Sequence, residues 1–202
     1  MDNRRRVGDV ATRIAAGIAL LEGAVCVVSI KYLGVRPVFT TWLLFFVASS
    51  LSFWTYWSSK KHSVRGNIAN FMDMFVCGVI TLSILSVEGS HLIGNAFDVY
   101  CLVASGVVLV FWRMTRRHEF SNMMLQIVMA TAYMPTFVKL WQATRNTESL
   151  PVWVLSWFGA VFAFISASAE RDKLGKIYAG RGLILVSVVV WLIMRIYWVV
   201  HP

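Results

Sequence analysis

Seven continuous apolar stretches constrain this chain more than any other feature of its sequence. A helix needs about 20 predominantly apolar residues to cross the hydrocarbon core of a bilayer. The stretches, numbered here as spans 1 to 7, cover residues 14–33, 38–58, 67–87, 95–112, 121–141, 151–169 and 182–200. They show no alternation of polar and apolar residues, so helices rather than barrel strands must satisfy their backbone groups. The sequence predicts an all-α membrane protein with seven transmembrane helices.

The composition agrees with this prediction. Charged residues make up 14% of the 202 residues and hydrophobic residues 58%, whereas a soluble domain carries about 25% charged residues. The net charge of +9 arises from basic clusters beside the apolar stretches. We attribute it to topology and to anionic lipid head groups rather than to nucleic-acid binding. The three cysteines lie inside apolar stretches, and an odd number of such thiols argues against a disulfide framework and against a zinc site.

The basic residues also predict an orientation. Of the 19 lysines and arginines, 14 lie in or beside the N-terminal tail and the loops after spans 2, 4 and 6, and 5 lie on the other side. Arg181 is counted with the loop after span 6. Because cytoplasmic loops are enriched in basic residues, we expect a multi-pass protein of the plasma (inner) membrane with its N-terminus in the cytoplasm and its C-terminus outside.

Spans 1–3 and 5–7 have a similar layout. The linkers Lys31–Pro37 and Thr144–Pro151 each contain a proline and precede a tryptophan-containing helix, with Trp42 in span 2 and Trp157 in span 6 at an offset of 115 residues. We therefore divide the chain into a cytoplasmic tail (1–13), a first three-helix repeat (14–87), a linker with helix 4 (88–119) and a second three-helix repeat (120–202). A single linker span keeps both repeats in the same orientation, as in parallel-repeat transporters.

The segment Tyr133–Trp141, with Pro135 in its third position, is followed by the linker Thr144–Leu150. Together they resemble a PQ-loop, which combines an aromatic-x-Pro-Gln helix end, a basic linker and a helix that opens with Ser or Pro. Thr136 stands where that motif has glutamine. The chain thus resembles the PQ-loop and SWEET-like superfamily of membrane transporters, and it is similar to uncharacterised bacterial PQ-loop-like proteins. The resemblance implies two parallel three-helix bundles, joined by a linker helix, around a central solute path.

Two carboxyl groups fall inside predicted spans, Glu22 in span 1 and Asp73 in span 3. An ionisable group in hydrocarbon costs roughly 2.5–3.5 kcal/mol on insertion scales and by default faces the bundle interior as a functional candidate. Both belong to the first half, so they can face each other across one bundle and serve a solute path or ion coupling. The alternative is a neutral, hydrogen-bonded packing role. Asp98 lies at a predicted helix start, where a carboxylate interacts favourably with the helix dipole.

Four further residues are candidates for the solute path, and a fifth is a candidate hinge. Gln126 in span 5 is expected to line it, because an amide inside a lipid-embedded helix needs a partner. Asn70 binds a polar solute or caps the start of span 3. Trp42 and Trp157 lie away from the membrane interfaces and either stack on a solute ring or pack. Pro135 removes a backbone hydrogen bond from span 5, which predicts a kink that serves as a hinge, although proline is also common in membrane helices.

Small residues recur at every fourth position in spans 1 and 6, and we interpret them as surfaces for close helix approach. They are Ala15, Ala19 and Gly23 in span 1 and Gly159, Ala163 and Ala167 in span 6. This interpretation assigns them a structural role and no chemistry.

These features predict a transporter that moves a small polar solute, such as a sugar, an amino acid or a vitamin-like molecule, by alternating access between two three-helix bundles. The alternative is a non-transporting membrane receptor or assembly protein with a closed interior. The sequence has no metal-ligand spacing, phosphate loop or nucleophile motif, so we expect neither enzymatic activity nor a cofactor. The expected partners are the solute and the lipid bilayer but no nucleic acid. The sequence is also compatible with a homo-oligomer.

Overall fold

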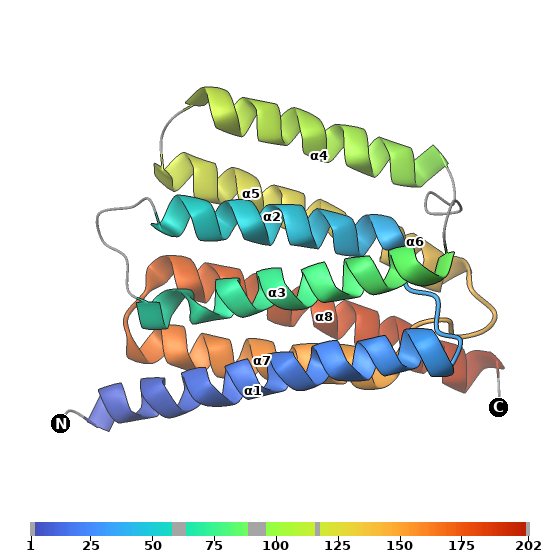
Figure 1. Cartoon of the computed structure of the whole chain (residues 1–202), viewed down its shortest axis with the longest axis horizontal. Helices are drawn as coiled ribbons and strands as arrows, with labels where there is room; N and C mark the ends of the chain where they lie inside the picture. Colours follow the sequence, from blue (N-terminus) through green and yellow to red (C-terminus); the bar gives the residue numbers. More distant parts are fainter. Residues whose placement is uncertain (1–2, 58–63, 89–95, 116–117, 201–202) are drawn as a thin grey trace.

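The computed structural model describes residues 3–57, 64–88, 96–115 and 118–200, which form eight helices and no strand. The helices are α1 (Asn3–Tyr32), α2 (Phe39–Trp57), α3 (Val64–Glu88), α4 (Ala96–Thr115), α5 (His118–Ala132), α6 (Met134–Gln142), α7 (Leu150–Ala169) and α8 (Lys173–Val200). Figure 1 shows them side by side along the long axis, with the two termini at opposite ends. The all-α class predicted from the sequence is confirmed.

Local signals explain where α1 ends and α8 begins. After α1, Gly34 adopts a φ of +67°, a left-handed conformation that glycine reaches without strain. Two nearby backbone N–H groups donate to the carbonyl of Ser29 and so complete the last turn. Before α8, the carboxylate of Asp172 accepts a hydrogen bond from the backbone N–H of Leu174 at 3.0 Å, as an N-cap does. These short turns bring consecutive helices back in opposite directions.

Two helices extend well beyond the predicted spans. Helix α1 begins at Asn3 and α8 at Lys173, so residues 3–13 belong to the first helix and do not form a separate tail. Hydropathy reports where apolar residues begin, whereas arginine and lysine are good helix formers that continue a helix beyond that point. As a consequence Arg181, expected in a loop, lies inside α8.

Predicted span 5 consists of two helices, because α5 ends at Ala132 and α6 begins at Met134. The interruption lies directly before Pro135, which has no backbone N–H and cannot continue the hydrogen-bond pattern of α5. The backbone N–H of Tyr133 bonds to the carbonyl of Ala130, three residues back, at 3.2 Å. The predicted interruption of span 5 is therefore present.

The helices pack in a regular order. Helix α3 contacts both α1 and α2, and α8 contacts α7 and the pair α5–α6. Between these two groups, α1 packs along α7, which is the most extensive contact of any helix pair, and α2 packs against α5. Helix α4 contacts chiefly α5 and lies at one edge of the molecule in Figure 1. The buried core therefore runs between the α1–α3 group and the α5–α8 group.

Several helices present apolar side chains to the outside. Within the described residues, α1, α7 and residues 173–198 of α8 are long and apolar enough to cross a membrane, and shorter apolar helical segments lie in α2, α3 and α4. Leu82, Val103 and Ile184 are more than half exposed, which suits contact with acyl chains rather than water. With the composition, these helices define a membrane protein.

Candidate functional site

Three side-chain hydrogen bonds join α1 to α7. The pairs are Thr12 with Ser166 at 2.7 Å, Glu22 with Ser156 at 2.5 Å, and Ser29 with the N-cap residue Ser149 at 3.1 Å. As the residue number rises along α1, the number of its partner falls by the same amount. The two helices are therefore antiparallel and keep one register along their contact. The α1–α7 interface is thus held by polar pairs at both ends and in the middle.

A cavity of about 110 Å³ lies beside this interface, lined by residues of α1, α2, α3, α5, α7 and α8. Small residues form the wall that α1 and α7 contribute: Ala15, Ala19, Gly159 and Ala163. The small-residue stripes thus allow the two helices to approach closely and also leave room beside them. Since one water occupies about 30 Å³ in the liquid, the cavity is large enough for a few waters or for a small organic molecule.

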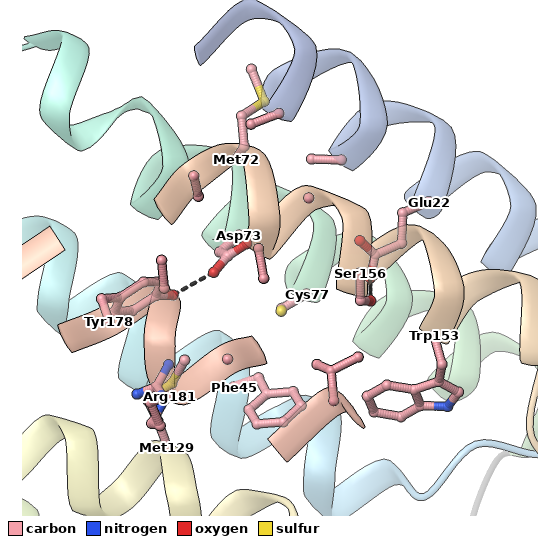
Figure 2. Close-up of a pocket in the computed structure, with 18 of the residues that line it drawn as sticks. Glu22, Phe45, Met72, Asp73, Cys77, Met129, Trp153, Ser156, Tyr178 and Arg181 are labelled. Atoms are coloured by element: carbon pink, nitrogen blue, oxygen red, sulfur yellow. Dashed lines mark hydrogen bonds between the residues drawn. The ribbon is translucent and has the colours of Figure 1, made fainter. Parts of the chain in front are cut away.

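Both predicted carboxyl groups line this cavity (Figure 2). Glu22 from α1 accepts a hydrogen bond from the Ser156 hydroxyl on α7, and Asp73 from α3 accepts one from the Tyr178 hydroxyl on α8. The two acids therefore do share one cavity. Each is held by a hydroxyl from the other helix group, so they connect the two groups rather than facing each other within one bundle.

One cation lines the same cavity. Arg181 of α8 donates from Nη1 to Oε1 of Gln126 on α5 at 2.5 Å, and its guanidinium lies 4.7 Å from the ring centroid of Tyr178. Gln126 is therefore not among the lining residues, as the sequence predicts it to be, but it contacts and orients the lining residue Arg181. In the described part of the chain, neither Glu22 nor Asp73 forms an ion pair.

Aromatic rings line another part of the cavity wall. Trp42 and Trp153 have ring centroids 5.7 Å apart, and the ring of Tyr133 lies 4.6 Å from that of Phe45 and 6.1 Å from that of Trp153. These distances fall in the range of favourable aromatic pairs. The indole Nε1 of Trp42 is buried and has no hydrogen-bond partner in the part of the chain that the structure describes, which is unusual for a buried tryptophan.

A second carboxyl cluster lies next to Trp153, in the loop between α6 and α7. Glu148 forms an ion pair with Lys139 at 3.1 Å and accepts a hydrogen bond from Nε1 of Trp153 at 3.4 Å. The Lys139 ammonium also donates to the carbonyl of Arg36, which ties this loop to the α1–α2 connection. Burial raises the pKa of Glu148 above its ordinary value, although Lys139 acts in the opposite direction. We call Glu148, Lys139 and Trp153 the loop cluster.

Trp157 is a second predicted site residue, after Gln126, that the structure corrects. Trp157 does not line the cavity, because its indole N–H donates to the Ser187 hydroxyl on α8 at 3.0 Å. At about 100° per residue, position 157 points roughly a quarter-turn away from the face that carries Ser156, Gly159 and Ala163. The tryptophan that stacks on Trp42 is Trp153.

The remaining predicted residues have mixed placements. Trp42 lines the cavity. Pro135 is buried at the start of α6, two residues after the lining residue Tyr133. Asp98 is buried in the first turn of α4, at a helix start as predicted. Asn70 falls within α3, but its side chain lies outside the described residues.

Sequence reasoning missed Ser156, Tyr178, Arg181 and Trp153 as cavity residues. One signal was available, because Tyr178, Arg181 and Val186 lie at helical spacing and share a face once α8 is extended to Lys173. The serine carries no such signal in the sequence, since its role follows from the α1–α7 register. Among the described residues, no group of three or more His, Cys, Asp or Glu side chains is placed to hold a metal ion.

The fold and the cavity together define a helical membrane protein with an internal polar site that contains two acids and one arginine. Comparison with protein-family models, with curated proteins and with solved structures finds no match for this chain. The arguments that follow therefore rest on its own residues.

Proposed function

We propose that this protein is a transporter that moves a small polar solute through the central cavity by alternating access between the α1–α3 and α5–α8 groups. The observation that carries this proposal is the pairing of Glu22 with Ser156 and of Asp73 with Tyr178. Each bond joins a carboxyl group of one helix group to a hydroxyl of the other. A relative movement of the two groups breaks these bonds and exposes the carboxyls to whatever fills the cavity.

The order of helix packing supports two parallel repeats in a seven-span chain. If α5–α6 is treated as one span, exchanging the two groups maps α1 onto α5–α6, α2 onto α7 and α3 onto α8. The contact of α1 with α7 then maps onto the contact of α5 with α2, and both contacts are present. Likewise α3 and α8 each pack against the two other helices of their group. Parallel repeats around a midplane site are a transporter architecture, and it is the layout that a PQ-loop-like protein would have.

The loop cluster and the Trp42–Trp153 pair support a closed path at one end of the cavity. Trp153 contacts Trp42 on the cavity side and donates to Glu148 on the loop side. In the orientation that the basic residues favour, with the N-terminus in the cytoplasm of the plasma membrane, this end is the outer one. We propose that it is the outer gate, and that the interruption before Pro135 is the hinge that lets α6 move with it.

Cys77 provides a natural reporter of access, because its side chain lines the cavity. We suggest a variant that keeps Cys77 and replaces Cys26 and Cys101 with alanine, reconstituted in vesicles of known orientation. Alternating access predicts that a small hydrophilic thiol reagent modifies Cys77 when added to either side. Adding Cys77→Ala supplies the matched control that should remain unmodified.

Solute flux is measured on the same vesicles with a panel of small polar solutes. Flux of at least one of them together with modification of Cys77 from both sides would support the proposal. An unreactive Cys77 with no flux would instead indicate a closed interior, and hence a membrane receptor or assembly protein on the same fold.

A further inference from the structure

The cavity has an unbalanced set of charges. Its lining contains two carboxyl groups, Glu22 and Asp73, and one guanidinium, that of Arg181. With all three ionised the formal charge is negative by one. Arg181 directs Nη1 to Gln126 and stacks on Tyr178, and within the described ranges both carboxyls have hydroxyl partners but no ion pair. The single guanidinium offsets one of the two carboxylates, and the other, when ionised, is a buried charge that is strongly unfavourable without compensation. The cavity therefore favours an occupant with one positive charge.

We propose that the cavity binds a small organic monocation, a primary ammonium whose charge lies between Glu22 and Asp73. This inference rests on the proposed function only in taking the cavity as the solute site. An ammonium group has three donors, which suits two carboxylates that each accept a single hydroxyl bond from the protein. The rings of Phe45 and Tyr133 line the same cavity, and aromatic faces attract cations.

A second observation indicates what else the solute carries. Trp42 is 3% exposed and lines the cavity, and its indole N–H has no hydrogen-bond partner among the described residues. A buried donor without an acceptor is unfavourable, and an acceptor on the solute removes that penalty. The ligand class is therefore a small amine that also has a hydroxyl or another uncharged acceptor, as an amino alcohol does.

Other solute classes fit the cavity less well. A neutral polyol leaves both carboxyls without a counter-charge, and an anion adds a third negative charge. A zwitterion adds no net charge to the cavity, so one carboxylate stays without a compensating cation, although its own carboxylate would meet the buried Nε of Arg181, which has no hydrogen-bond partner among the described residues. The cavity volume of about 110 Å³ also favours a molecule of a few heavy atoms.

The test is thermal unfolding of the purified full-length chain with four probes of nearly equal size at neutral pH. Ethanolamine is the cationic amino alcohol, ethylene glycol the neutral analogue, glycine the zwitterion and glycolate the anion. A ligand that binds only the folded state raises the unfolding temperature. We expect a concentration-dependent rise with ethanolamine and little or none with the other three. An equal or larger rise with any of them, or no rise with ethanolamine, overturns the proposal.

Variants locate the site. Glu22→Gln and Asp73→Asn keep the shape of each side chain and remove its charge, so each should weaken ethanolamine binding about tenfold or more. Ser166→Ala is the matched control, because it breaks a pair of the same α1–α7 interface outside the cavity lining and should bind as the wild type does. Trp42→Phe should reduce the preference for ethanolamine over ethylamine. Unchanged binding in both carboxyl variants contradicts the site.

The outcomes separate this inference from the proposed function. Flux of a neutral or anionic solute in vesicles, with no binding of ethanolamine, leaves the transporter and removes the cation site. Binding of ethanolamine that depends on Glu22 and Asp73, without flux of any solute, leaves the site and removes transport.

Discussion

The protein buries carboxyl groups in two places, and their surroundings differ. In the loop cluster, Glu148 has the ammonium of Lys139 at 3.1 Å and the indole N–H of Trp153 at 3.4 Å. In the central cavity, Glu22 and Asp73 each accept a hydrogen bond from one hydroxyl of the opposite helix group. The first carboxyl has an ion-pair partner supplied by the protein, whereas in the described residues the other two form no ion pair and share a single arginine in the cavity lining.

This difference separates a structural acid from acids that are available to a ligand. A buried carboxyl with a complete set of partners contributes to the fold, and removing a partner damages it. A buried carboxyl held only by a hydroxyl is compatible with more than one occupant, because a proton or a bound cation can neutralise it. Stability and ligand binding should therefore respond in opposite ways to substitutions in the two places.

The largest expected effect on stability is that of Lys139→Met. The substitution leaves Glu148, which is 4% exposed, without its counter-charge, and breaking one side of a buried ion pair costs roughly 3–5 kcal/mol. We expect a loss near the lower end of that range, about 3 kcal/mol, because Lys139 is itself partly exposed. Chemical unfolding in mixed micelles measures it. A loss well below about 1 kcal/mol would show that the loop cluster does not hold this end of the molecule.

Removing the charge of a cavity acid should have the opposite sign. Glu22→Gln and Asp73→Asn each replace a carboxyl that forms no ion pair in the described residues with a neutral amide of similar shape. Because the desolvation of a charge is then no longer needed, we expect stability without ligand to stay equal or rise by up to about 2 kcal/mol. The same unfolding measurement serves both variants. A loss comparable to that of Lys139→Met would place these acids in the structural class.

A smaller effect separates the two stacked tryptophans. Trp153→Phe removes the N–H that donates to Glu148 and should cost about 1 kcal/mol beyond its change in packing. Trp42→Phe removes an N–H that has no partner, so only the packing change remains. The difference in unfolding free energy between the two variants is the measurement, and equal losses would mean that the bond to Glu148 contributes nothing.

The smallest expected effect is a dependence on pH that belongs to Glu148. Burial raises its pKa above the ordinary value of about 4.5, so the folded state holds this proton more tightly than the unfolded chain does. The resulting stabilisation is fully present below the unfolded pKa and is lost as pH rises through the folded pKa. Comparing wild type with Glu148→Gln across this window isolates the contribution, which we expect to be the smallest of these effects. A stability of the wild type relative to Glu148→Gln that instead rises with pH across this window would have the wrong sign.

Part of the cavity could be predicted from the sequence. Glu22 and Asp73 stand out because ionisable residues are rare inside apolar stretches, and both line the cavity. The interruption at Pro135 follows from the missing backbone N–H. The repeat pattern predicts Trp157 rather than Trp153, because an error of one helical turn in the alignment of the two repeats leaves that pattern almost unchanged. Hydropathy places Arg181 in a loop, because it does not show that α8 begins at Lys173.

Hydropathy and composition suffice to identify the class of this protein and the residues that lie among apolar neighbours, because the transfer free energy of a segment is a sum over its own residues. Which side chains meet depends on how the helices pack. The bonds of Glu22 to Ser156 and of Asp73 to Tyr178 join residues 134 and 105 positions apart. Such pairs depend on how each helix is rotated about its axis and on its register against a distant neighbour, and neither quantity is a property of a single segment.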